Sequence, residues 1–192
     1  MKPTAILVAL LVSNSFLLTA QNTAAPPKAE PAKAAQVEPV KNPVTTAVKE
    51  IFARQQKNLV AAVEAMPADK FGYQPTPEQM TFSHLVEHMT GSNIELCGKA
   101  ASMPPPPLHA GPDMKKDMLL GLLNRSFAYC EAALNRVDDS KLGNSVEIFG
   151  GKQVTVAYAL IALTNDWADH YSAAATYLRL NGILPPTAQP KK

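Results

Sequence analysis

The sequence has four histidines, and three of them lie four residues from another candidate metal ligand. His84 and His88 are four residues apart, and His170 follows Asp166 at the same interval. In a helix, this spacing places two side chains on one face, one turn apart. Two such pairs on facing helices of a bundle can bind a metal ion. The pattern alone leaves two alternatives open: a core histidine bonded to a carboxylate, or an Asp–His pair on the surface.

Apolar residues that recur every three or four positions predict the helices that position these side chains. We expect four helices, at residues 44–66, 81–101, 113–137 and 153–180. Prolines follow the first, second and fourth of them, and proline cannot continue a helix. Residues 138–152 are expected to be a polar connection with a turn at its glycine pair. Because the remaining sequence shows no strand-like alternation, we predict an all-α protein with a four-helix bundle.

The predicted helices separate the histidines into two groups. His88 lies at the edge of the apolar stripe of the second helix, and His170 lies on the stripe of the fourth, which Asp166 adjoins. His84 is in the first turn of the second helix, after a plausible N-cap, and is expected to be exposed. His109 is in a proline-rich connection and is expected to be a solvated loop residue. By position, His88, Asp166 and His170 are thus better placed for a metal site inside a bundle than His84 or His109, and the two alternatives stay open.

The N-terminal region differs from the rest of the chain. Residues 1–23 combine an early lysine, an apolar run and small residues after it, which is typical of a secretory signal peptide. The apolar run is short for a membrane span, although an uncleaved N-terminal anchor is an alternative. Residues 24–43 are rich in Ala, Pro and Lys, so we expect a linker without a core. These features predict an exported protein, periplasmic or extracellular, that leaves the membrane after cleavage of the signal.

Composition limits the class of partner. Hydrophobic residues make up 46% of the 192 residues and charged residues 18%, which allows one domain with a sizeable core. The net charge of +2 comes from the N-terminal region, because residues 44–192 carry equal numbers of acidic and basic side chains. A neutral body lacks the basic surface that nucleic-acid binding requires, so we expect no nucleic-acid partner.

Three stretches of the sequence resemble the DinB/YfiT-like family of metalloproteins. They are the segment from Asn58 to Pro67, FGYQPTPEQMTFSHLVEHM at 71–89, and DHYSAAATYLRLNGILPP at 169–186. With the third helix, they cover nearly all of residues 44–188. The resemblance implies a four-helix bundle of up-down-down-up topology over 44–188, and it also makes a homodimer possible.

The resemblance also implies a ligand set. The family holds its metal with one histidine on the second helix and an H-x-x-x-H pair on the fourth. His88 and His170 match this pattern, but Asp166 stands where the family has the first histidine of the pair. A carboxylate oxygen is also a competent ligand. The resemblance therefore implies a divalent ion (zinc, iron, manganese or nickel) with coordination positions left open.

Two classes of function remain open. The family includes thiol-dependent transferases and isomerases, so one class is a metal-dependent enzyme, either a hydrolase or a thiol-dependent transferase. The other is a non-catalytic bundle that binds a small ligand or serves a structural role, with a vestigial metal site, which the substitution at Asp166 favours. Tyr171 and Arg179 are candidates for contact with a small-molecule substrate; packing and capping of the last turn are their alternative roles.

The two cysteines, Cys97 and Cys130, lack the spacing of a zinc motif. Up-down-down-up topology, implied by the resemblance, makes the second and third helices parallel. Each cysteine is at a similar distance from the start of its helix, so the two sulfurs would lie at the same height. An exported protein meets oxidising conditions. We therefore predict a disulfide, with two reduced, buried cysteines as the alternative.

Overall fold

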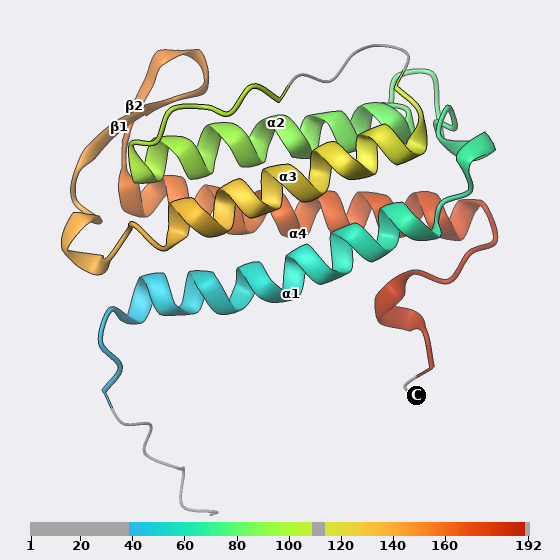
Figure 1. The fold of residues 1–192 in the computed structure, drawn as a ribbon. Helices are drawn as coiled ribbons and strands as arrows, with labels where there is room; N and C mark the ends of the chain where they lie inside the picture. The colour runs from blue at the N-terminus through green and yellow to red at the C-terminus, as the bar shows by residue number, and fades with distance from the viewer. Residues whose placement is uncertain (1–38, 109–113, 191–192) are drawn as a thin grey trace, which may run out of the picture. The chain divides into compact units, whose positions relative to one another are not determined.

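A computed structural model describes residues 39–108 and 114–190; the expected signal peptide, most of the expected linker and His109 lie outside these ranges. The chain forms four long helices: α1 (Pro43–Ala65), α2 (Phe82–Ala101), α3 (Lys116–Leu134) and α4 (Val156–Leu180). Figure 1 shows α1 and α4 running in one direction and α2 and α3 in the other. The predicted all-α bundle and its up-down-down-up order are thus confirmed.

The helices enclose one apolar core. Helix α2 packs against α3 and α4, while α1 packs against α4 and α3. Aromatic rings meet at the centre, where the ring centroid of Phe52 lies 5.4 Å from that of Trp167 and 6.0 Å from that of Phe127. The largest fully buried side chains also include leucines from three helices: Leu59, Leu119, Leu123, Leu160, Leu163 and Leu178. These positions belong to the periodic apolar stripes of the sequence, because one face of each helix is turned inward.

Each helix start needs acceptors for its free backbone N–H groups. Thr81 and Thr155 supply them locally for α2 and α4, since each hydroxyl accepts a hydrogen bond from the first turn. Helix α1 uses a distant residue instead: the carboxylate of Asp139 accepts hydrogen bonds of 2.9 Å from the backbone nitrogens of both Val44 and Thr45. These hydrogen bonds hold the connection after α3 against the start of α1.

The expected polar connection before α4 has its turn at the glycine pair, as predicted, but it also contains a β-hairpin that was not predicted. Strand β1 (Ser145–Ile148) pairs with β2 (Lys152–Thr155) in antiparallel register, with Ile148 opposite Lys152. Gly150 and Gly151 reverse the chain with φ angles of 68° and 79°, which side-chain-bearing residues rarely adopt. Helix α4 consequently begins at Val156 and not at residue 153. Short runs with β-branched residues on either side of a glycine pair are the signal for this hairpin.

Helix α3 is shorter than predicted. It ends at Leu134, and the side chain of Val137 is buried although it lies beyond the helix.

The parallel arrangement of α2 and α3 brings Cys97 and Cys130 together in a disulfide, with Cα atoms 5.1 Å apart. Within the described residues, no helix has the length and hydrophobicity that crossing a membrane would require.

Candidate metal centre

Three side chains from two helices meet at one point between α2 and α4. His88 comes from α2, and Asp166 and His170 come from α4, with one potential ligand atom of each lying within 4.8 Å of the others. The two imidazole rings have their centroids 4.9 Å apart. His170 is buried, Asp166 is partly buried and His88 is exposed. The cluster therefore has one side in the bundle and one side toward solvent.

The hydrogen bond of His170 determines which ring nitrogen can bind a metal. Its Nδ1 lies 2.6 Å from the backbone carbonyl oxygen of Asp166, one turn earlier in α4. A carbonyl only accepts, so Nδ1 carries the proton and Nε2 of the neutral ring keeps its lone pair. Metal-binding histidines commonly donate their other N–H to a carbonyl or carboxylate in this way. This hydrogen bond leaves Nε2 of His170 as the ring nitrogen that is available to a metal ion.

The carboxylate of Asp166 has one oxygen without a hydrogen bond. Oδ2 is buried and has no hydrogen-bond partner among the residues that the structure describes, although it lies 3.3 Å from Nδ1 of His170. The Nδ1–H donates to the closer carbonyl oxygen of Asp166, and the carboxylate beside it also acts on the imidazole. A buried, unpartnered carboxylate oxygen is costly unless a cation neutralises it. This atom is the strongest structural indication that the cluster fits a metal ion.

The two histidines have pKa values shifted in opposite directions. Burial acts to lower the pKa of His170, but the carboxylate and backbone carbonyl of Asp166 outweigh it, and the net shift is upward. For His88, partial burial and the neighbouring His170 lower the pKa. His88 therefore has its lone pair available at neutral pH, whereas a metal ion must compete with a proton at His170.

A buried polar network, which the sequence analysis missed, holds α4 in register with α2. The indole nitrogen of Trp167 donates a 2.7 Å hydrogen bond to Oδ1 of Asn93, whose Nδ2 donates a 3.0 Å bond to Ser126. All three side chains are buried. Because Trp167 lies between Asp166 and His170, this network helps to orient the part of α4 that carries both candidate ligands. An asparagine within the apolar stripe of the second helix was the available sequence signal.

The other predicted site residues lie outside the cluster. His84 is exposed, as expected from its place in the first turn of α2. The hydroxyl of Tyr171 donates a 2.8 Å hydrogen bond to Thr187 in the C-terminal turn, which packs against α1. Arg179 is exposed and bonds to the Ala175 carbonyl of its own helix. These contacts are structural, and a role in substrate binding for Tyr171 and Arg179 stays a prediction.

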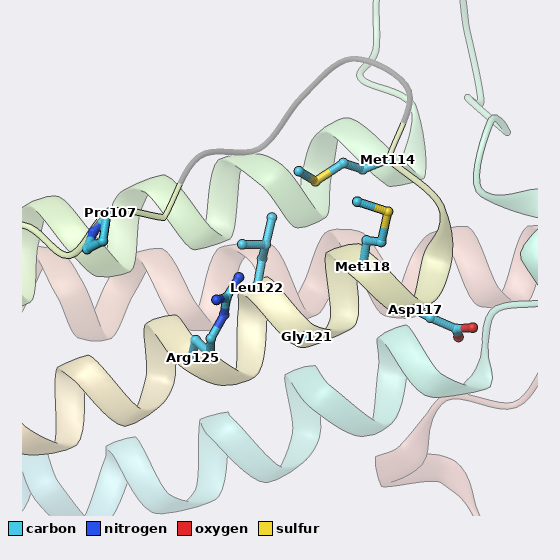
Figure 2. A pocket seen from close by; sticks show the side chains of 7 residues that line it. All are labelled: Pro107, Met114, Asp117, Met118, Gly121, Leu122 and Arg125. Carbon is cyan, nitrogen blue, oxygen red and sulfur yellow. The ribbon is translucent and has the colours of Figure 1, made fainter.

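The groove that Figure 2 shows is separate from the cluster. It has a volume of about 630 Å³ and lies between α3 and the connection that precedes it. Figure 2 shows Met114 and Met118 side by side and Arg125 extending beside Leu122. Within the described part of the chain, no second group of three metal-binding side chains exists.

Comparison with known families agrees with this architecture. The sequence profile of the DinB superfamily matches residues 51–174, which include all three cluster residues. The chain belongs to the DinB superfamily. No curated protein matches the sequence significantly. The superfamily assignment thus rests on the profile, and the fold agrees with it.

Solved structures share the DinB fold at low sequence identity. A DinB-like protein from Bacillus subtilis is 20% identical, with a TM-score of 0.60 over 76% of this chain and 99% of the other. A DinB-like protein from Bacillus cereus is 13% identical, with a TM-score of 0.61 over 73% and 95%. The mycothiol-dependent maleylpyruvate isomerase is 16% identical, with a TM-score of 0.53 over 67% of this chain but only 59% of the isomerase. At these identities, the likeness concerns the fold alone.

Proposed function

We propose that this DinB-superfamily protein binds one divalent metal ion through His88, Asp166 and His170 and uses it in catalysis on a small molecule. The observation that carries the proposal is the buried Oδ2 of Asp166, which lies beside two imidazoles and has no hydrogen-bond partner within residues 39–108 and 114–190. Two imidazoles and one carboxylate are a ligand set that zinc, iron(II) and manganese accept. Nickel accepts imidazole ligands as well.

The spacing of the ligand atoms supports the proposal. Atoms bound to one zinc ion at about 2.0–2.2 Å in tetrahedral geometry lie about 3.5 Å apart. The atoms of the cluster lie within 4.8 Å of one another before any ion is considered. A contraction on the order of 1 Å, which side-chain rotation can supply, is therefore sufficient for binding. Exposure of His88 leaves a path for the ion and for a substrate from solvent.

Each residue has a separate task in this proposal. His170 is oriented by its own helix through the Nδ1–H bond to the Asp166 carbonyl. Asp166 balances part of the positive charge, and His88 connects α2 to the site. The ion, when bound, supplies Lewis acidity that lowers the pKa of a coordinated water or thiol toward neutrality. Three protein ligands leave at least one coordination position for such a molecule.

Two reaction types are consistent with that chemistry. A hydrolase would use an activated water, and a thiol-dependent transferase would use an activated thiol. The fold shared with the mycothiol-dependent maleylpyruvate isomerase supports including the thiol-dependent type. A non-catalytic bundle with a vestigial site is the competing function. Metal analysis distinguishes it from the two enzymatic functions, because both enzymes require a stoichiometric metal ion.

The test is stoichiometric metal binding by the purified chain. Apo protein would be titrated with zinc, iron(II), manganese and nickel by calorimetry, and the loaded protein analysed by mass spectrometry for metal content. We expect one ion per chain, lost in His88→Ala and in His170→Ala. The matched control is His84→Ala, which removes an exposed histidine one turn away on the same helix. Absence of a stoichiometric ion, or equal loss in His84→Ala, would contradict the assignment.

We also propose that the protein is exported. The supporting observation is the Cys97–Cys130 disulfide, because disulfides form and persist in oxidising compartments. The test is fractionation of cells expressing the full chain, followed by N-terminal sequencing of the product. We expect a processed protein outside the cytoplasm that starts near residue 24; an intact chain in the cytoplasm would contradict export.

A further inference from the structure

The groove beside α3 has an apolar floor and one cationic end. Its volume of about 630 Å³ lies within the range of about 300–1,000 Å³ that is typical of small-molecule sites. Leu122 is 3% exposed and forms part of the floor, whereas Met118 beside it is 55% exposed. Met118 therefore keeps much of its apolar surface outside the core of the bundle, where a ligand can reach it.

The spacing of the lining residues gives the groove a direction. Met118, Gly121, Leu122 and Arg125 follow one another at intervals that place them on one face of α3. Met114, just before the helix begins, lies next to Met118 at one end, and Arg125 lies toward the other end (Figure 2). About 10 Å of helix separates Met118 from Arg125 by the rise per residue. An elongated ligand with an apolar body and one charged end fits this arrangement.

The charge of the groove indicates the sign of that end. Among the residues that the structure places, the guanidinium of Arg125 makes no ion pair and no hydrogen bond. Its planar fork of N–H donors matches the two oxygens of a carboxylate. Asp117, the acidic residue of the lining, has its carboxylate directed away from the two methionines in Figure 2. A carboxylate is therefore complementary to the end at Arg125.

The middle of the groove suits a flexible alkyl chain. A Cβ atom at Gly121 would meet no atom of a neighbouring element within 4 Å, so the helix surface is open at this point. Methionine side chains are flexible and adapt to apolar partners of different shape. The two methionines can thus pack along a linear chain, and Gly121 leaves room for it between them and Arg125.

We propose that this groove binds a medium-chain carboxylate of the fatty-acid type. Its alkyl chain lies along Met114, Met118 and Leu122, and its carboxylate meets Arg125. Burial of the chain supplies most of the affinity, and the guanidinium determines the orientation. The site shares no residue with the metal cluster, so it is independent of the proposed catalysis.

The first test is a fluorescence titration of the full purified, metal-free chain with dansylaminoundecanoate below its micelle-forming concentration. We expect saturable binding at one site, displaced by dodecanoate. Dodecanol has the chain without the charge and acetate the charge without the chain, so each should compete at least about tenfold less well. Absence of saturable binding, or competition by dodecanol as strong as that by dodecanoate, overturns the proposal.

The second test fills the groove without adding charge. Gly121→Leu should weaken binding of the probe at least about tenfold and leave the helix intact, because leucine has the higher helix propensity. The matched control is Gly91→Leu on α2, where a Cβ atom is equally free of neighbours. Circular dichroism shows that both variants are folded. Equal loss of binding in the two variants overturns the location of the site.

The third test removes the cation. Arg125→Gln should weaken dodecanoate binding at least about tenfold but change dodecanol binding less than about twofold. Arg136→Gln is the control, because Arg136 is also exposed and lies beyond the end of α3. Equal effects of the two substitutions on dodecanoate overturn the role of Arg125.

A lipid surface presents similar chemistry, and a vesicle assay distinguishes it from a free carboxylate. Wild-type protein and Gly121→Leu would be sedimented with phosphatidylglycerol vesicles. We expect the two proteins to behave alike, because the groove takes a single chain. Vesicle binding that Gly121→Leu abolishes, without binding of free dodecanoate, overturns the proposal in favour of a membrane contact.

Discussion

The indole nitrogen of Trp167 and the side-chain oxygen of Asn93 are joined by a 2.7 Å hydrogen bond inside the bundle. The bond connects α4 to α2 across 74 positions of sequence, and Asn93 continues the connection to α3 through Ser126. Both members are buried, so neither can exchange its partner for water. Buried polar groups whose hydrogen-bond partners are all present favour one packing register of the helices over others.

Replacement of Trp167 by phenylalanine is expected to destabilise the fold strongly. Trp167→Phe leaves Oδ1 of Asn93 buried without a donor and leaves unfilled volume, so the free energy of unfolding should fall by about 2–4 kcal/mol. Chemical denaturation followed by circular dichroism measures the change. The control is Tyr171→Phe, which removes an exposed hydroxyl bonded to Thr187 and should cost less than about 0.5 kcal/mol. Similar losses in both variants would contradict a special role for the network.

Substitutions at Asp166 test the ligand assignment without removing the side chain. Asp166→Asn keeps the shape but removes the charge, so metal affinity should fall more than about tenfold. Asp166→His introduces the residue that the resemblance to DinB relatives predicts here, and it should restore binding. Calorimetric titration of both proteins with zinc measures the difference. Asp169→Asn is the matched control on an exposed carboxylate, with a change of less than about fivefold.

The disulfide should contribute substantially to stability. Cys97 and Cys130 are separated by 33 positions, and cross-linking a loop of this length stabilises a fold by about 3–4 kcal/mol through the unfolded chain. Replacing both cysteines with alanine should lower the free energy of unfolding by that amount. Reductant should destabilise the wild-type chain and leave the variant unaffected. Two reactive thiols per chain in unreduced, denatured protein would show that the bridge is absent.

The Asp139 cap should make stability depend on acid pH. Loss of hydration acts to raise the pKa of Asp139, but hydrogen bonds from Thr45 and Val44 outweigh it, and the pKa lies below its ordinary value of 3.8. A lowered folded-state pKa stabilises the fold above pH 3.8, and this contribution is lost as pH falls further through the folded value. Thermal unfolding of the wild type and Asp139→Asn should therefore differ near neutral pH and converge in acid. A difference that is constant with pH would contradict the role of the charge.

Local patterns in the sequence were sufficient to predict the four helices and to place Asp166 and His170 together, while the choice of His88, Asp166 and His170 as a ligand set depended on the family resemblance. The apolar stripes have the period of a helix, and a spacing of four places Asp166 and His170 on one face whatever the surroundings. Proline and N-cap residues likewise act on the turn that contains them, so Thr81 was recognisable as the start of α2. The hairpin before α4 was missed although its glycine pair was noticed, because two four-residue strands provide a short and weak periodic signal.

Tertiary structure decided the properties that depend on residues distant in the sequence. The cap of α1 by Asp139 joins groups 94 and 95 positions apart, and no periodic pattern connects them. The unpartnered oxygen of Asp166 and the bond between Asn93 and Trp167 likewise follow from how α2 and α4 pack. Sequence periodicity shows which face of a helix is buried, but only packing determines which atoms on two such faces come within bonding distance.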